Sequence, residues 1–91
     1  YVPPISEFDP SLQVVWLVPR EVIRKKTKNG KDYYLVKVID SNSETNTIKC
    51  WGVRPDKDVI HLNRPYMARL NWDPQWGFSS RRINSEFKLL A

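Results

Sequence analysis

Apolar and polar side chains alternate in two runs, residues 33–39 and 47–53, on either side of a polar turn at residues 41–46. Successive side chains of a strand point to opposite faces of a sheet, so each run predicts a strand with one buried face. The buried face is predicted to consist of Tyr34, Val36, Val38, Ile48 and Cys50. The other face is predicted to carry Tyr33, Leu35, Lys37, Ile39, Lys49, Trp51 and Val53.

The rest of the pattern predicts three further strands. The first, Leu12–Ile23, contains Pro19, which cannot donate a ladder hydrogen bond and therefore indicates a bulge, an edge or a bend. After it comes Asn29-Gly30, a dipeptide suited to a tight hairpin because both residues tolerate positive φ. The other two strands, Tyr66–Trp72 and Trp76–Ile83, are joined by a turn around Pro74.

The segments between and beyond the strands complete the predicted architecture. Within residues 54–64, Pro55 is followed by Asp56 and Asp58, which suits a short helix or helical turn between the third and fourth strands. Residues 1–10 are predicted to be an extended lead-in, residues 11–83 the domain, and residues 84–91 a tail that can be helical. The whole is typical of an all-β, five-stranded OB-fold barrel, with a five-stranded SH3-like barrel as the alternative.

Composition narrows the partners that such a domain can have. With 91 residues, the chain is long enough for one small core. Fifteen Lys and Arg against ten Asp and Glu give a formal charge of +5, which favours a polyanionic partner. No apolar run is long enough to span a membrane, and we expect a cytoplasmic, reducing location.

Rings and cations on one predicted face suit single-stranded nucleic acid, because aromatic faces stack on bases and lysines contact the phosphates between them. Trp51 with Tyr33 is the main candidate for stacking, and packing of Trp51 under residues 54–62 is the alternative. Trp16 is predicted to lie in the core. Further binding candidates in the loops and the fourth strand are Lys25, Lys26, Lys28, Lys31, Arg69, Trp72 and Trp76. The lysine cluster has a solvated hairpin as its alternative, and one of the two later tryptophans is expected to pack on the barrel end.

Catalysis, a metal site and a cofactor are not expected. Cys50 and His61 lie eleven residues apart without a third orienting group, and the three glycines form no phosphate-binding loop. A single cysteine cannot form an intramolecular disulfide or a cysteine-based zinc site, so Cys50 is predicted to be a buried apolar residue. His61 is predicted to be structural.

The run from Val14 to Arg82 resembles the OB-fold family that includes anticodon-binding domains and the OB domain of the bacterial replicative DNA polymerase III alpha subunit. The resemblance rests on KTKNGKDYYLVKVIDS, a basic hairpin followed by an apolar strand that ends in Asp, and continues with TIKCWGV and PYMARLNW. Asn63-Arg64-Pro65 replaces the family's Gly-rich lead into the fourth strand. The resemblance implies a nucleic-acid site on the second and third strands, with stacking at Tyr33 or Leu35 and a polar contact at Lys49.

These observations predict a non-catalytic module that binds single-stranded DNA and belongs to a larger replication protein. Two alternatives stay open: an RNA or anticodon-type ligand, and a protein-interaction OB domain whose Trp and Leu surface contacts another domain or a replication partner.

Overall fold

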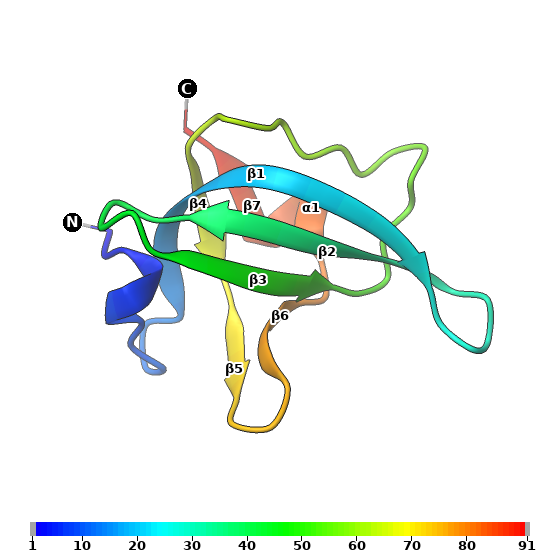
Figure 1. Cartoon of the computed structure of the whole chain (residues 1–91), viewed down its shortest axis with the longest axis horizontal. Coiled ribbons are helices and arrows are strands. Elements are labelled where there is room, and N and C mark those ends of the chain that lie inside the picture. Colours follow the sequence, from blue (N-terminus) through cyan, green and yellow to red (C-terminus); the bar gives the residue numbers. More distant parts are fainter. Residues whose placement is uncertain (1, 91) are drawn as a thin grey trace.

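The computed structural model describes residues 2–90, which form one curled sheet (Figure 1). Within these residues the sheet has seven strands in the order β5-β6-β3-β2-β1-β4-β7. The predicted all-β class is therefore confirmed, although there are seven strands rather than five. Tyr1 and Ala91, the first residue of the predicted lead-in and the last of the predicted tail, lie outside the described residues.

The longest strand, β1 (Val14–Lys26), bends so that it pairs with a different neighbour along each part of its length. Residues 14–17 pair with β4 (Tyr66–Arg69), and residues 18–26 pair with β2 (Asp32–Ile39). The register shifts between Pro19 and Glu21, so Arg20 has no residue opposite it. A bulge of this kind bends and twists a strand, which explains the long arc of β1 in Figure 1.

The predicted inner face of β2 and β3 (Thr45–Cys50) is confirmed, since all five of its side chains are buried in the core. The strands are antiparallel, with Tyr34 opposite Cys50 and Leu35 opposite Lys49. Val53 is also buried, and its predicted place on the other face was wrong. The strand ends at Cys50, and Gly52 has a φ of 65°, so the chain turns and the alternation stops.

The predicted fourth strand is interrupted at the buried Leu70, whose N–H donates a hydrogen bond to the carbonyl of Gln13 (2.8 Å). Beyond it, β5 (Asn71–Asp73) forms a hairpin with β6 (Gly77–Ser80). β6 in turn pairs in parallel with β3. The consecutive strands β4 and β5 therefore lie far apart in the strand order, and the sheet between them curls around the core.

Both ends of the described chain pack against the sheet. The 3-10 helix η1 (Ile5–Glu7) buries Ile5, and Pro4 forms a parallel bridge with Trp16. At the other end, α1 (Ile83–Glu86) is followed by β7 (Phe87–Leu89), which pairs with β4. Trp16 itself is only half-buried, because its neighbours Val15 and Leu17 point into the core; the prediction that it lies in the core was wrong.

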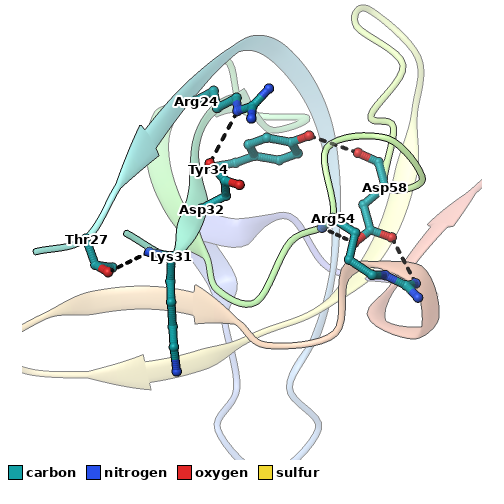
Figure 2. Close-up of polar contacts among 7 residues, drawn as sticks. All are labelled: Arg24, Thr27, Lys31, Asp32, Tyr34, Arg54 and Asp58. Carbon is teal, nitrogen blue, oxygen red and sulfur yellow. Dashed lines mark hydrogen bonds and ion pairs between the residues drawn. The ribbon is translucent and has the colours of Figure 1, made fainter. Parts of the chain in front are cut away.

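The segment predicted to be a short helix or helical turn between the third and fourth strands begins with a helical turn that does not continue as a helix. In this turn the N–H groups of Lys57 and Asp58 donate to the carbonyl of Arg54 (2.8 and 2.7 Å). The carboxylate of Asp58 accepts hydrogen bonds from the Arg54 N–H (2.7 Å) and guanidinium (3.3 Å), as Figure 2 shows. The hydroxyl of Tyr34 donates to the carbonyl of Asp58 (3.1 Å), which holds this segment against the end of β2.

Candidate functional site

Two aromatic rings meet on the side of β2 and β3 that faces away from the core. Tyr34 pairs with Cys50, so the preceding Tyr33 lies beside Trp51, just beyond the end of β3. Their ring centroids are 4.8 Å apart and their planes are tilted by 34°. The Trp51 N–H donates to the Ser80 carbonyl (2.8 Å), which anchors the tryptophan backbone to β6. The predicted pair therefore shares one face.

The strand register extends this face onto β1 and along β3. Lys25 lies opposite Tyr33, and Ile23 lies opposite Leu35. Side chains of directly paired residues point to the same side of a sheet, so these residues form one continuous surface. We call it the outer face, and it comprises Glu21, Ile23, Lys25, Tyr33, Leu35, Lys37, Lys49 and Trp51.

Basic groups on the outer face are open to solvent. The ammonium group of Lys37 forms an ion pair with the Glu21 carboxylate (3.3 Å), and both side chains are more than half exposed. Such a pair is worth at most about 1 kcal/mol, so the lysine can exchange it for another anion. Lys37 also lines a wide hollow of about 850 Å³ with Arg20 and residues 45–47. The lining of that hollow contains no ring, so it suits contacts with phosphate rather than stacking.

A narrower groove of about 470 Å³ continues the outer face toward β6. Trp76 lies in it and is 64% exposed. The Lys49 ammonium is 5.3 Å from the centroid of the Trp76 ring, within the range of a cation–π contact. Ser79, opposite Lys49 in the parallel β3–β6 pair, also lines this groove. We call it the Trp51–Trp76 groove, and its lining is Lys49, Trp51, Asp73, Trp76, Gly77, Ser79 and Arg81.

The lysine-rich hairpin between β1 and β2 extends beyond the neighbouring strands (Figure 1). Its turn is closed by the Gly30 N–H, which donates to the Thr27 carbonyl (2.9 Å), and Gly30 has a φ of 79°. The Thr27 hydroxyl accepts the Lys31 N–H (3.1 Å), and the Lys31 side chain points away from this turn in Figure 2. Lys26, by contrast, lies opposite Asp32.

The hairpin lysines are therefore not equivalent. Lys25 is on the outer face, whereas Lys28 and Lys31 belong to the exposed turn at its edge. Lys26 alternates to the other side of β1 from Lys25. A ligand on the outer face can reach Lys25 directly and the turn lysines from its margin.

Trp72 lies apart from the other predicted site residues. In the β5–β6 hairpin it pairs with Phe78, and the ring centroids of the two are 4.7 Å apart. Phe78 contacts Phe8 edge-on, with centroids 5.2 Å apart. Trp72 lines a separate pocket with Ile5 and these phenylalanines. The expectation that one of the two later tryptophans packs on the sheet end applies to Trp72, and only Trp76 lies in the groove.

Arg69 also lies away from the groove. It is on β4, opposite Val14, and is not among the residues that line the groove. Its positive charge helps to lower the pKa of Glu86 on α1. The prediction that it shares a surface with Lys49 and Trp51 is not supported by its position.

Sequence reasoning missed several residues of this surface, among them Ile23, Ser79 and Arg81. Ile23 contributes an apolar contact beside Leu35, while Ser79 and Arg81 line the groove. The alternation of β1 contained a signal for Ile23, but the bulge at Arg20 changes which residues face outward. Ser79 and Arg81 reach the site only through the parallel pairing of β6 with β3, which no local pattern reveals.

The described residues were also compared with the requirements of a metal site and of a membrane span. Among residues 2–90 no cluster of His, Cys, Asp or Glu has the arrangement of a metal site. His61 is exposed, and its backbone N–H donates to the Tyr66 hydroxyl (2.8 Å). No helix in the described part of the chain is long and apolar enough to cross a membrane.

The outer face and the Trp51–Trp76 groove thus combine a pair of rings in contact, an exposed indole and a surplus of basic side chains. They are carried by β1, β2, β3, β6 and the turn between β5 and β6. Comparison of the chain with models of protein families, with curated proteins and with solved structures found no match.

Proposed function

We propose that the chain is a binding module for single-stranded nucleic acid and that the ligand lies across the outer face and the Trp51–Trp76 groove. The observation that carries the proposal is the contact between Tyr33 and Trp51, with centroids 4.8 Å apart, on a face that also presents Lys25 and Lys49. DNA is the expected ligand, and the experiment below includes RNA.

The strand pairing supports the finer proposal that this sheet is an OB-fold barrel. If β4 and β5 are taken as one strand interrupted at Leu70, the main strands number five. They then follow the ring β1-β2-β3-β6-β5/β4-β1, with a long bent β1 and a parallel β3–β6 pair. OB-fold barrels bind oligonucleotides on the face of their second and third strands, between the loops that join strands one to two and four to five. Those positions correspond here to the outer face, the lysine hairpin and the turn that carries Trp76.

Stacking would supply the part of the affinity that does not depend on base identity. Trp51 and Trp76 both line the groove, and Trp76 is 64% exposed. Large exposed rings are costly to hydrate, and each base that stacks on one contributes about 1–3 kcal/mol. Tyr33 covers one side of the Trp51 indole and so holds it in place for a ligand.

Contacts with phosphates would supply the electrostatic part of the binding affinity. Basic side chains on this surface, Lys25, Lys37, Lys49 and Arg81, outnumber the acidic Glu21 and Asp73. Contact with phosphates releases counterions, so affinity is expected to fall with salt, with a log–log slope of about −0.7 for each phosphate contacted.

Anisotropy of a labelled oligothymidine, titrated with the protein over a range of salt concentrations, tests the proposal. Trp51→Ala should weaken binding by about 1–3 kcal/mol because a stacking platform is lost. Trp72→Ala is the matched control, since it removes an exposed indole from the other face of the β5–β6 hairpin and should leave binding unchanged.

A second matched pair separates contact from net charge. Lys49→Gln and Lys88→Gln change the formal charge equally, but Lys88 is on β7, opposite Met67 and away from the outer face. Only Lys49→Gln should reduce the salt slope, by about 0.7. Absence of binding at low salt, or equal effects of both members of each pair, would contradict the proposed function.

Competition between DNA and RNA oligomers of the same sequence identifies the preferred sugar. A contact with the 2′-hydroxyl favours RNA, whereas a surface that reads only bases and phosphates treats the two alike.

A protein partner is the second candidate, and one observation favours it. Ile23 and Leu35 lie opposite each other in the middle of the outer face, both half-buried, and form an apolar strip between the charged rows. A partner that covers this strip would bind with an affinity that resists high salt, together with no measurable affinity for oligonucleotides.

A further inference from the structure

Asp73 places a carboxylate in the otherwise basic Trp51–Trp76 groove, and its geometry is defined by the turn that follows β5. Its Oδ1 atom accepts the backbone N–H groups of Gln75 (2.8 Å) and Trp76 (3.0 Å). An Asp side chain that caps its own turn in this way is held in one orientation. The same bonds fix the backbone of Trp76, so the carboxylate and the indole are positioned together.

The second carboxylate oxygen of Asp73, Oδ2, is free to accept hydrogen bonds. Within residues 2–90 it has no hydrogen-bond partner, and the nearby cations Lys49 and Arg81 form no ion pair with it. An ionised carboxylate can only accept hydrogen bonds, and it repels phosphate. This corner of the groove therefore suits a group on a ligand that donates hydrogen bonds and carries no negative charge.

The bases of a nucleic acid differ in what they offer to such an acceptor. Cytosine, adenine and guanine each carry an exocyclic amino group, and a carboxylate accepts from the cytosine N4 amino group. Thymine and uracil present a carbonyl oxygen at the corresponding position, which a carboxylate oxygen repels. The volume of the groove, about 470 Å³, is within the usual range of small-molecule sites, roughly 300–1,000 Å³. It can therefore receive a nucleoside beside Trp76.

We infer that Asp73 makes this groove selective for a base with an exocyclic amino group. The base lies against an indole of the groove and donates its amino hydrogen to Asp73 Oδ2, while Lys49 and Arg81 contact the flanking phosphates. The inference rests on the proposed function and adds a preference among bases to a site that is otherwise indifferent to sequence.

Oligomers of deoxycytidine and deoxyuridine, each about ten nucleotides long, are the probes, since this length suits one module of this size. The two bases share a ring, a backbone and the lack of a methyl group, and differ at N3 and at the amino or carbonyl group on C4. At neutral to mildly alkaline pH the protein should bind the cytosine oligomer about fivefold more tightly, which is the contribution of one charge-assisted hydrogen bond in an open groove.

Asp73→Asn is the decisive variant because the asparagine carbonyl can still accept the N–H groups of Gln75 and Trp76, while its amide NH₂ replaces Oδ2 with a donor. It should abolish or invert the ratio of the two affinities. Glu44→Gln is the control, since it removes the same charge from an exposed residue outside the groove, and it should raise both affinities slightly without changing their ratio. Unchanged far-UV circular dichroism verifies that both variants fold.

The outcomes distinguish this inference from the proposed function. Binding of both oligomers with equal affinity, or a ratio that Asp73→Asn leaves unchanged, overturns the selectivity and leaves the nucleic-acid module standing. Failure of both oligomers to bind at low salt removes the module and the selectivity together. A cytosine preference that Asp73→Asn abolishes supports both.

Discussion

Cys50 acts in the core as a small apolar side chain. It is fully buried, between Tyr34 on β2 and Ser80 on β6. Burial raises the pKa of its thiol to about 12, because the thiolate would lose its solvation, and the charge of Glu86 adds to the effect. The thiol is therefore neutral near neutral pH, and its predicted burial is confirmed.

We expect an aromatic disulfide reagent to label Cys50 very slowly in the native protein, since only the exposed thiolate reacts. In denaturant the same cysteine should react within the mixing time, and this reaction is the control. Release of the chromophore, followed by absorbance, measures both rates. Native labelling as fast as that of a free cysteine would show that the core around β3 opens readily.

At the residue scale, local alternation predicted the Tyr33–Trp51 pair but not the place of Trp72. The faces of β2 and β3 follow from the sequence pattern because each strand has a solvated and a buried side. The side to which Trp72 points depends on the pairing of β5 with β6, and β6 is held by the distant β3. Trp16 was missed because Val15 and Leu17 take the core face of this part of β1, which leaves Trp16 on the opposite face.

At the scale of elements, the bulge in β1 decides which side chains form the outer face. Before it, Val15 and Leu17 point inward; after it, Ile23 and Lys25 point outward opposite β2. The extra residue, Arg20, is exposed and has no partner across the strand pair. Pro19 correctly predicted an irregularity here.

Deletion of Arg20 should destabilise the fold, because β1 would lose the bulge that bends it from β4 to β2. Lys25 and Val22 would keep their faces, since Pro19 and Glu21 already pair with consecutive residues of β2. Arg20→Ala is the matched control and should change the free energy of unfolding by no more than about 0.5 kcal/mol. Urea unfolding followed by tryptophan fluorescence compares the two, and a deletion variant as stable as the control would contradict this account of the bulge.

The element boundaries that sequence reasoning missed share one physical cause. The predicted fourth strand reads as continuous, yet Leu70 donates its N–H to Gln13, and the chain changes partner there from β1 to β6. Residues 54–64 do begin with the predicted helical turn, but the Asp58 carboxylate binds the Arg54 N–H and the turn does not continue as a helix. In the first segment a hydrogen bond to a residue distant in the sequence outweighs the local strand propensity. In the second, a side chain that bonds to the backbone four residues before it outweighs the local helix propensity.

At the scale of the whole molecule, three carboxylates order the peripheral segments. Asp40 accepts the Ser6 N–H (3.0 Å) and so holds η1, while Glu86 accepts the Ser80 hydroxyl (2.7 Å) and so holds α1. Asp58 accepts the Arg54 N–H (2.7 Å) and so closes the turn at residues 54–58. Burial alone would raise the pKa of each group, but the hydrogen bonds together outweigh it and lower each pKa below its ordinary value.

Stability should therefore fall in acid. A carboxyl whose pKa is lower in the folded state contributes its full stabilisation above its unfolded pKa, about 3.9 for Asp and 4.3 for Glu, and loses it as the pH falls through the folded value. Urea midpoints should be nearly constant from pH 7 to 5 and should drop steadily below about pH 4.

Asp40→Asn should reduce this acid dependence, because one of the three titrating groups is removed. Asp56→Asn, at an exposed position, is the control and should leave the dependence as it is. Midpoints that stay constant down to pH 3 would show that these carboxyls are not bound more tightly in the folded state than in the unfolded chain.

The strand order also limits how copies of the molecule can interact. The strands at its two ends, β5 and β7, are each three residues long. A sheet edge recruits a second chain through its unpaired N–H and C=O groups, and edges this short offer few of them. Neighbouring copies of the protein, even when concentrated on one nucleic-acid strand, should therefore remain separate molecules and should not pair into a continuous intermolecular sheet.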